Sequence, residues 1–290
     1  MGFCELVKSG NTVLLDGAMG TQLDKRGLMG RGRNNLDAPD AVLEIHQEYA
    51  RCGCDALTTN TLTMNRIYIE THNVGVEVRD VNRAGAKLAR QAAGEKQYVL
   101  GDISSTGKLL EPYGQYKEAQ FYAAFKEQAE ILSEAGVDAF IIETMFDLRE
   151  ALCAVRACKD NFSLPVIASI AFATKEKGGR TMMGNSAAQC AGELTDAGVD
   201  VVGANCGDID PAAMAEIVGM LKSATTVPIL AQPNAGRPKL VGAQTVFDMA
   251  PESFEEGIFK CIGAGANIVG GCCGTTPEHI LAIVKNLKKG

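Results

Sequence analysis

The sequence feature that most constrains the fold is a pattern that occurs four times. A glycine is followed by one residue, then by Asp or Asn, then by apolar residues, and the copies begin at Gly53, Gly136, Gly198 and Gly265. Each copy indicates a helix that ends at the glycine and a buried strand that follows it. The later copies start 62 and 67 residues apart. Because one βα unit takes roughly 30 residues, each interval is predicted to hold a further strand.

Short apolar runs fill these intervals. They are rich in Val, Ile and Leu and lie at residues 12–16, 98–102, 165–170 and 228–232. Eight strands that alternate with amphipathic helices and leave no linker predict a single (β/α)8 TIM barrel of the α/β class, one domain over residues 1–290. A doubly wound open sheet is the alternative fold, but the chain contains neither G-x-G-x-x-G nor G-x-x-x-x-G-K-[ST].

Charge and composition exclude several functions. The chain has 28 basic and 35 acidic side chains and a net charge of -7, with no basic run before Lys288-Lys289. Nucleic acid is therefore not an expected partner. No apolar stretch approaches the roughly 20 residues that span a bilayer, and Glu5 and Lys8 interrupt any signal-peptide core. We expect a cytoplasmic protein with no membrane partner, whose ten cysteines stay reduced.

The C-terminal ends of the strands are the candidate functional positions, because active sites of TIM barrels lie there and in the following loops. In chain order these ends are Asp16, Asn60, Asp102, Glu143, Ser169, Asn205-Cys206, Gln232 and Cys272-Cys273. The long connections at residues 104–115, 174–186 and 233–249 are rich in Gly and polar residues. We expect them to be able to cover a ligand.

Three of these strand-end residues predict a metal site. Cys206 follows the sixth strand and Cys272 and Cys273 follow the eighth, so only one strand separates them in a closed barrel. Three thiolates favour zinc, and three protein ligands leave a fourth position open, as in catalytic zinc sites. His46, His72 and His279 fall on predicted helices or a distal loop, so we expect an all-sulfur set. Such a site suits activation of a substrate thiol for S-alkylation.

Two other functions remain open for the same segment. Gly270, Gly271 and Gly274 precede a helix that starts near residues 276–277, with Thr275 and Glu278 at the spacing of a capping box. Barrels often bind phosphate after strands 7 and 8, so a metal-free barrel that binds a phosphorylated ligand is an alternative. A redox role for the adjacent cysteines is weaker, because they lack C-x-x-C spacing.

The motifs also carry a family resemblance. Residues 15–21 (Leu-Asp-Gly-Ala-Met-Gly-Thr), 203–207 (Gly-Ala-Asn-Cys-Gly) and 270–277 (Gly-Gly-Cys-Cys-Gly-Thr-Thr-Pro) resemble the homocysteine S-methyltransferase family over essentially the whole chain. The resemblance implies a homocysteine-binding barrel that transfers a methyl group to homocysteine and forms methionine. It also implies that Cys206, Cys272 and Cys273 bind the zinc that activates the homocysteine thiol.

Further strand-end residues are expected to bind the substrate. Asp16 and Glu143 suit the ammonium of an amino acid by charge, and the resemblance implies homocysteine binding there. Backbone N–H groups of Gly17, Ala18 and Met19 are expected to hold the carboxylate end. Residues 233–236 (Pro-Asn-Ala-Gly) are similar to a turn of the cobalamin-dependent methionine synthase branch, which makes Asn234 the candidate exchangeable zinc ligand.

The methyl donor is the least determined point. The Pro-Asn-Ala-Gly similarity favours methylcobalamin, carried by a separate corrinoid protein because the chain ends just past the eighth predicted helix. S-methylmethionine, S-adenosylmethionine and betaine are the alternatives, since other family members use small donors. A non-catalytic zinc subunit that docks on a corrinoid protein is a third possibility. The sequence is also compatible with a homo-oligomer.

Overall fold

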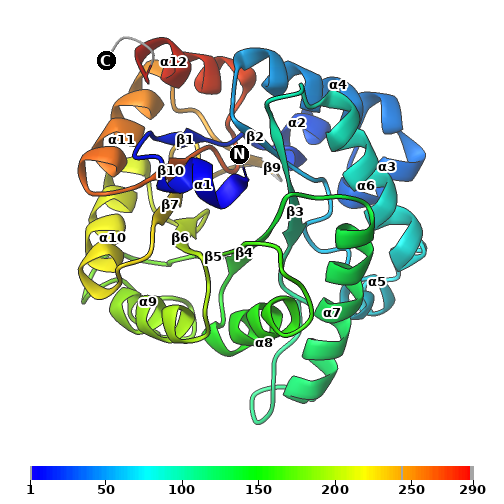
Figure 1. Ribbon diagram of the computed structural model, residues 1–290. Helices are drawn as coiled ribbons and strands as arrows, with labels where there is room; N and C mark the ends of the chain where they lie inside the picture. Colours follow the sequence, from blue (N-terminus) through cyan, green and yellow to red (C-terminus); the bar gives the residue numbers. More distant parts are fainter. Residues whose placement is uncertain (1, 243, 288–290) are drawn as a thin grey trace.

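Eight parallel strands close into a barrel surrounded by helices, so the predicted TIM barrel is confirmed (Figure 1). The computed structural model describes residues 2–242 and 244–287. Around the barrel the strands follow the order β1-β10-β7-β6-β5-β4-β3-β2, and a bridge between Leu15 and Ala56 joins β1 to β2. The strands are β1 (Val13–Leu14), β2 (Ala56–Thr58), β3 (Tyr98–Ile103), β4 (Ala139–Met145), β5 (Val166–Ile170), β6 (Val201–Asn205), β7 (Ile229–Gln232) and β10 (Ile268–Val269).

The helices, apart from the first, follow the strands and form the outer layer (Figure 1). They are α1 (Phe3–Lys8), α2 (Gly20–Lys25), α3 (Asn34–Asp37), α4 (Pro39–Cys52), α5 (Arg66–Thr71), α6 (Val78–Ala92), α7 (Glu118–Glu134), α8 (Leu148–Lys159), α9 (Ala187–Asp196), α10 (Pro211–Ala224), α11 (Pro251–Gly263) and α12 (Pro277–Leu287). Within the described ranges, none of them has the length and apolar character to cross a membrane. The Lys288-Lys289 pair lies outside the described residues.

The four-fold sequence pattern has a common backbone conformation. Gly53, Gly136, Gly198 and Gly265 all adopt positive φ, between 83° and 112°. A side chain strains this left-handed conformation, which explains why glycine ends the preceding helix each time. In each copy, a strand begins three residues after the glycine.

The Asp or Asn of the pattern joins two strands. Asp55, Asp138, Asp200 and Asn267, which we call the strand-start acceptors, each precede an even-numbered strand of the barrel (β2, β4, β6 and β10). Asp200, for example, accepts a hydrogen bond at Oδ2 from Val166 N (2.9 Å) and donates its own N–H to Val166 O (2.8 Å). The same two-bond ring joins the other three to residues of β1, β3 and β7, namely Leu14, Val99 and Ile229. The repeat thus encodes four strand-pair contacts.

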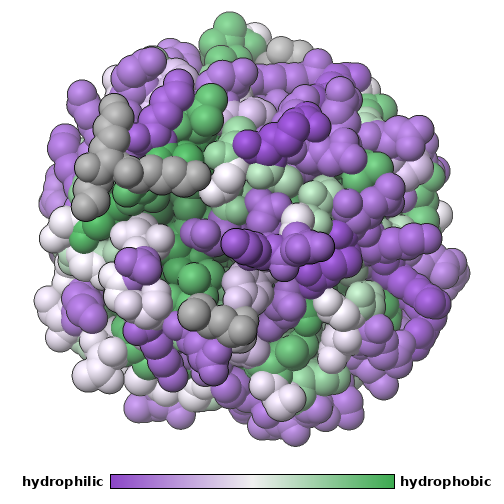
Figure 2. Space-filling model, turned by 45° about the horizontal axis from the view of Figure 1, so that its top comes forward, coloured by the Kyte–Doolittle hydropathy of each residue, from purple (hydrophilic) through white to green (hydrophobic). Residues whose placement is uncertain are grey.

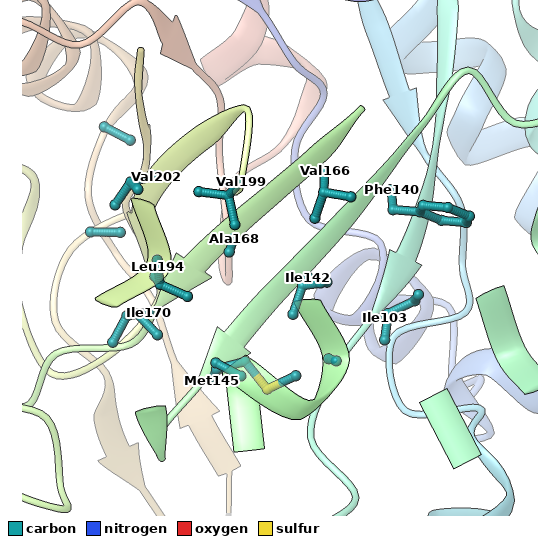
Figure 3. Close-up of a cluster of buried hydrophobic side chains, with 14 of the residues drawn as sticks. Ile103, Phe140, Ile142, Met145, Val166, Ala168, Ile170, Leu194, Val199 and Val202 are labelled. Carbon is teal, nitrogen blue, oxygen red and sulfur yellow. The ribbon is translucent and has the colours of Figure 1, made fainter. Parts of the chain in front are cut away.

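Two hydrophobic layers stabilise the barrel. The inner one fills the barrel with alternate strand residues such as Leu100, Ile141 and Leu230, and Phe3 and Val7 of α1 pack against them. Accordingly, α1 lies across the centre of the barrel in Figure 1. The outer layer lies between strands and helices, and Figure 3 shows part of it, in which Ile142 and other strand residues gather with Leu194 of α9. The face in Figure 2 is mostly hydrophilic.

One segment contains structure that the sequence analysis did not predict. The connection after β7 forms a hairpin of two antiparallel strands, β8 (Lys239–Val241) and β9 (Gln244–Val246). Leu240 and Val241 of this hairpin are exposed. These strands pair only with each other, outside the barrel sheet.

The hydrogen bonds of the strand-start acceptors predict that two substitutions of Asp200 lower the stability of the protein to different extents. Asp200→Ala leaves the Val166 N–H without its acceptor and should lower the free energy of unfolding by about 1–3 kcal/mol. Asp200→Asn keeps an acceptor oxygen, as Asn267 does in the fourth copy, and should cost less than about 1 kcal/mol. Urea unfolding followed by circular dichroism measures both.

Lys159→Ala is the control for this series. Lys159 Nζ lies 3.1 Å from Asp200 Oδ2, and both side chains are partly exposed, so this ion pair should contribute at most about 1 kcal/mol. If Asp200→Ala, Asp200→Asn and Lys159→Ala lowered the free energy of unfolding by equal amounts, Asp200 would stabilise the protein only through its ion pair with Lys159.

Candidate metal centre

Three cysteines meet at the C-terminal end of the barrel. Cys206 directly follows β6, and Cys272 and Cys273 follow β10, with β7 between these strands as predicted (Figure 1). Their three Sγ atoms lie within 4.8 Å of one another, and Cys206 Sγ is 4.0 Å from Cys273 Sγ. Within residues 2–242 and 244–287 this is the only group of three or more His, Cys, Asp or Glu side chains close enough to share a metal ion.

The backbone around β7 holds the cysteines in place. Cys206 N donates to Gln232 O (3.2 Å), and Cys272 N donates to Pro233 O (2.9 Å). In the other direction, Ala235 N donates to Cys273 O (2.9 Å). Cys206 itself has a φ of 55°, an uncommon conformation for a residue with a side chain. This conformation persists because the neighbouring hydrogen bonds define it, as is typical of functional sites.

The three thiols interact electrostatically. Hydrogen bonds from Cys272 and Cys273 lower the pKa of the Cys206 thiol to about 3. The same hydrogen bonds raise the pKa of Cys272 well above its usual value and that of Cys273 to about 12. These interactions therefore favour the thiolate at Cys206 and the thiol at Cys272 and Cys273. A divalent cation would displace the remaining protons, because thiolates are the form that ligates metals.

The residues fit a zinc ion. Tetrahedral zinc with Zn–S distances near 2.3 Å brings sulfur ligands to roughly 3.8 Å from one another, close to the separations seen here. The histidines lie elsewhere, as predicted: His46 is buried in α4, His279 lies in α12 and His72 follows α5. Burial lowers the pKa of His46 to about 4, so this ring is neutral at pH 7.

Asn234 lies beside the cysteines with one unused oxygen. It is 1% exposed, and its Nδ2 donates to Gly207 O (3.0 Å). A hydrogen bond from its side chain helps to lower the pKa of Cys206. Its Oδ1, by contrast, is buried with no partner among the described residues. Buried polar atoms are nearly always paired, and a metal ion held by the cysteines would give this oxygen a partner.

Asn205 connects the cysteines to Glu143. Its Nδ2 donates to Glu143 Oε2 (2.5 Å) and lies 3.8 Å from Cys272 Sγ, while its Oδ1 accepts from Ser169 Oγ (2.7 Å) and from Thr144 N (2.9 Å). Glu143 lies within β4 rather than at its end, beside a register shift at which Thr144 has a φ of 57°. Burial, followed by the charge of Cys206, raises the pKa of Glu143 to about 7.

Two more carboxylates are buried at the same end of the barrel. Asp16 accepts a hydrogen bond at Oδ2 from Thr58 N (2.9 Å), and burial raises its pKa to about 7. Asp102 is 4% exposed, and burial together with the charges of Glu143 and Asp16 raises its pKa well above the usual range. From the sequence, Asp102 is a strand-end residue without a predicted role.

The glycine-rich turn after β10 does not form a phosphate cradle. Backbone N–H groups of Gly270, Gly271, Gly274 and Thr275 all donate within the protein, to Ala231 O, Asp16 O, Thr21 Oγ1 and Cys272 O. These four N–H groups are therefore not free to bind a phosphate, which weakens this alternative. The capping box of α12 lies one residue later than the predicted pair of Thr275 and Glu278. In the structure Thr276 N donates to His279 Nδ1. The hydroxyl of Thr275 instead accepts a hydrogen bond from Ala18 N (2.9 Å).

The turn at residues 17–19 has one N–H group already in use. Because Ala18 N donates to Thr275 Oγ1, the N–H groups of Gly17 and Met19 are the ones left for a ligand. Gly17 has no room for a side chain, since a Cβ there would lie 2.8 Å from Thr275 Oγ1 and 2.9 Å from the Tyr49 ring. The turn therefore packs tightly against the segment that carries Cys272 and Cys273.

Comparison with known proteins agrees with this geometry. A family model described as homocysteine S-methyltransferase matches residues 13–287. The methionine synthase of Mycobacterium tuberculosis is 33% identical over 98% of this chain, and that of Mycobacterium leprae is 32% identical over 91%. The chain spans about a quarter of the length of these relatives, 25% and 23%.

Solved structures show the same fold. The homocysteine methyltransferase MmuM from Escherichia coli, in its metallated form, superposes with a TM-score of 0.77 at 21% identity and covers 97% of this chain and 98% of its own. The carboxyl transferase domain of Rhizobium etli pyruvate carboxylase superposes with a TM-score of 0.53 at 15% identity, over 93% of this chain and 41% of its own. At these identities the likeness concerns the barrel alone.

The cysteine geometry predicts a stoichiometric metal site. Purified protein should contain about one zinc per chain, and Cys273→Ala should lose most of it, because two thiolates hold zinc far less tightly than three. Elemental analysis after dialysis against a weak chelator measures the content. Cys4→Ala is the matched control, since Cys4 lies in α1 at the opposite end of the barrel. A Cys273→Ala protein that retains full zinc would contradict the assignment.

Proposed function

The chain belongs to the homocysteine S-methyltransferase family, and on this premise we propose that it is a zinc-dependent enzyme that methylates the homocysteine thiol to give methionine. The observation that carries the proposal is the convergence of three cysteine sulfurs within 4.8 Å, beside an asparagine oxygen that is buried without a partner. A bound zinc ion would lower the pKa of a coordinated thiol, so that the thiolate nucleophile exists at neutral pH.

The protein's own residues would position the substrate for this chemistry. Cys206, Cys272 and Cys273 would hold the metal, and Asn234 Oδ1 is the proposed exchangeable fourth donor. Asn205 would keep Glu143 next to the metal ligands, since its Nδ2 contacts both Glu143 and Cys272. These fixed positions supply orientation, which lowers the barrier of a bimolecular transfer.

The amino-acid end of homocysteine would bind between the first and fourth strands. We propose that Asp16 and Glu143 accept hydrogen bonds from its ammonium group. The N–H groups of Gly17 and Met19, in the turn that also contains Ala18, would hold its carboxylate. Both carboxylates are at most 7% exposed, so a bound ammonium would be shielded from water and its ion pairs strengthened.

A methyl-corrinoid is the proposed donor. Twelve large hydrophobic side chains of the described residues are exposed, and all but Phe259 and Leu281 lie in segments that follow a strand at the mouth of the barrel. These ten are Met29, Leu36, Leu109, Tyr113, Phe146, Met182, Met183, Leu240, Val241 and Val246. Exposed apolar side chains on these segments can contact a large, protein-borne donor more extensively than a small ion. The Pro-Asn-Ala-Gly turn at residues 233–236 supports the same choice.

Parallel assays should identify the donor. The zinc-loaded protein is incubated with homocysteine and, separately, methylcobalamin, S-methylmethionine, S-adenosylmethionine and glycine betaine, and methionine is measured. We expect turnover with methylcobalamin. Turnover with a sulfonium donor or betaine, and none with methylcobalamin, would overturn the proposed donor. The proposal that zinc activates the homocysteine thiol would still stand. No methionine with any donor, in a protein that binds zinc, would favour the non-catalytic subunit.

A further inference from the structure

A ring of polar side chains lies directly above the inner core of the barrel. Strand side chains alternate between the two faces, so residues two positions beyond an inner-core residue also point into the barrel. Ala56, Leu100, Ile141, Ile167 and Leu230 belong to the inner core. The corresponding residues nearer the mouth are Thr58, Asp102, Glu143, Ser169 and Gln232, which we call the polar layer.

Asp102 is the residue of this layer whose carboxylate is least satisfied. It is 4% exposed, and its Oδ1 is buried with no hydrogen-bond partner among the described residues. Glu143, by contrast, accepts from Asn205 Nδ2 and Thr144 Oγ1, and Asp16 accepts from Thr58 N. An unpaired buried carboxylate costs free energy, so the fold retains Asp102 at the expense of stability.

The surroundings of Asp102 offer acceptors and negative charge. Thr58 Oγ1 and Gln232 Oε1 are buried without partners, and Gln232 is only 3% exposed. The charges that act on Asp102 are those of Glu143 and Asp16. The described carboxylates are not close enough together to form a metal site, because the cysteines make up the only such group. A ligand that brings its own positive N–H donors matches this set.

We propose that Asp102 recognises the ammonium group of the amino-acid methyl acceptor and thereby sets the preference for α-amino thiols. The inference rests on the proposed function, since it takes the thiol of the same ligand to bind at the cysteines. Thr58, Asp102 and Glu143 lie on the successive neighbouring strands β2, β3 and β4. An ammonium group has three N–H donors and can bridge acceptors on adjacent strands.

A comparison of two thiols isolates this contact. The full chain is loaded with Co²⁺, and the thiolate-to-cobalt absorption is titrated with homocysteine or with 4-mercaptobutanoate, which lacks only the amino group. Wild-type protein should bind homocysteine about 10- to 100-fold more tightly, as expected for charge-assisted hydrogen bonds. Asp102→Asn should lose about tenfold or more of this preference, while its affinity for 4-mercaptobutanoate should stay within about twofold.

Two controls separate recognition from folding. Glu150→Gln removes another buried carboxylate, one that accepts hydrogen bonds from Ser105 and Thr106, and should keep the preference. Asp102→Asn and Asp102→Ser should melt no lower than wild type, because the carboxyl group that they replace has a buried oxygen without a partner, whereas a structural role predicts a lower melting temperature.

The outcomes distinguish this inference from the proposed function. An unchanged preference for homocysteine in a folded Asp102→Asn protein would overturn the role of Asp102 and leave the zinc chemistry standing. If neither thiol changed the cobalt spectrum of the wild type, the proposed function itself would fail, and this inference with it.

Discussion

Pairing of the strands by the strand-start acceptors is the interaction on which the rest of the structure depends. Each of the four two-bond rings joins the start of one strand to its neighbour. A shift of one residue in a strand would exchange its inward and outward side chains. The polar layer would then face the helices, and the apolar residues that now contact the helices, such as Ile142 in Figure 3, would face the barrel interior.

Correct register brings unfavourable features together at one end of the barrel. Cys206 and Thr144 have left-handed backbone, and Asp102 and Asn234 have buried oxygens without partners. Each feature costs stability, and the apolar layers on both sides of the sheet supply the compensation. Such an arrangement is typical of a preorganised site, in which polar groups already have the positions that they need to bind a charged ligand or a metal.

Much of this architecture could be predicted from the sequence. The positive-φ glycines and apolar runs are local signals, so all eight strands were located, and the cysteine group followed from the order of strands in a barrel. Contacts between distant side chains have no such signal. The hydrogen-bond network of Asn205 depends on a register shift in β4. That Oδ1 of Asp102 has no hydrogen-bond partner can be recognised only when the positions of all neighbouring side chains are known. The one-residue error at the α12 cap arose because Thr275 is used by Ala18 instead.

The central claim is that the three cysteines hold a metal that binds the substrate thiol directly. X-ray absorption at the zinc edge tests it, because sulfur and lighter ligands scatter differently and lie at different distances. The account predicts three sulfurs and one oxygen or nitrogen in the resting protein, in keeping with the unpartnered Oδ1 of Asn234, and four sulfurs after homocysteine is added. A sulfur count that stays at three with saturating homocysteine would contradict it.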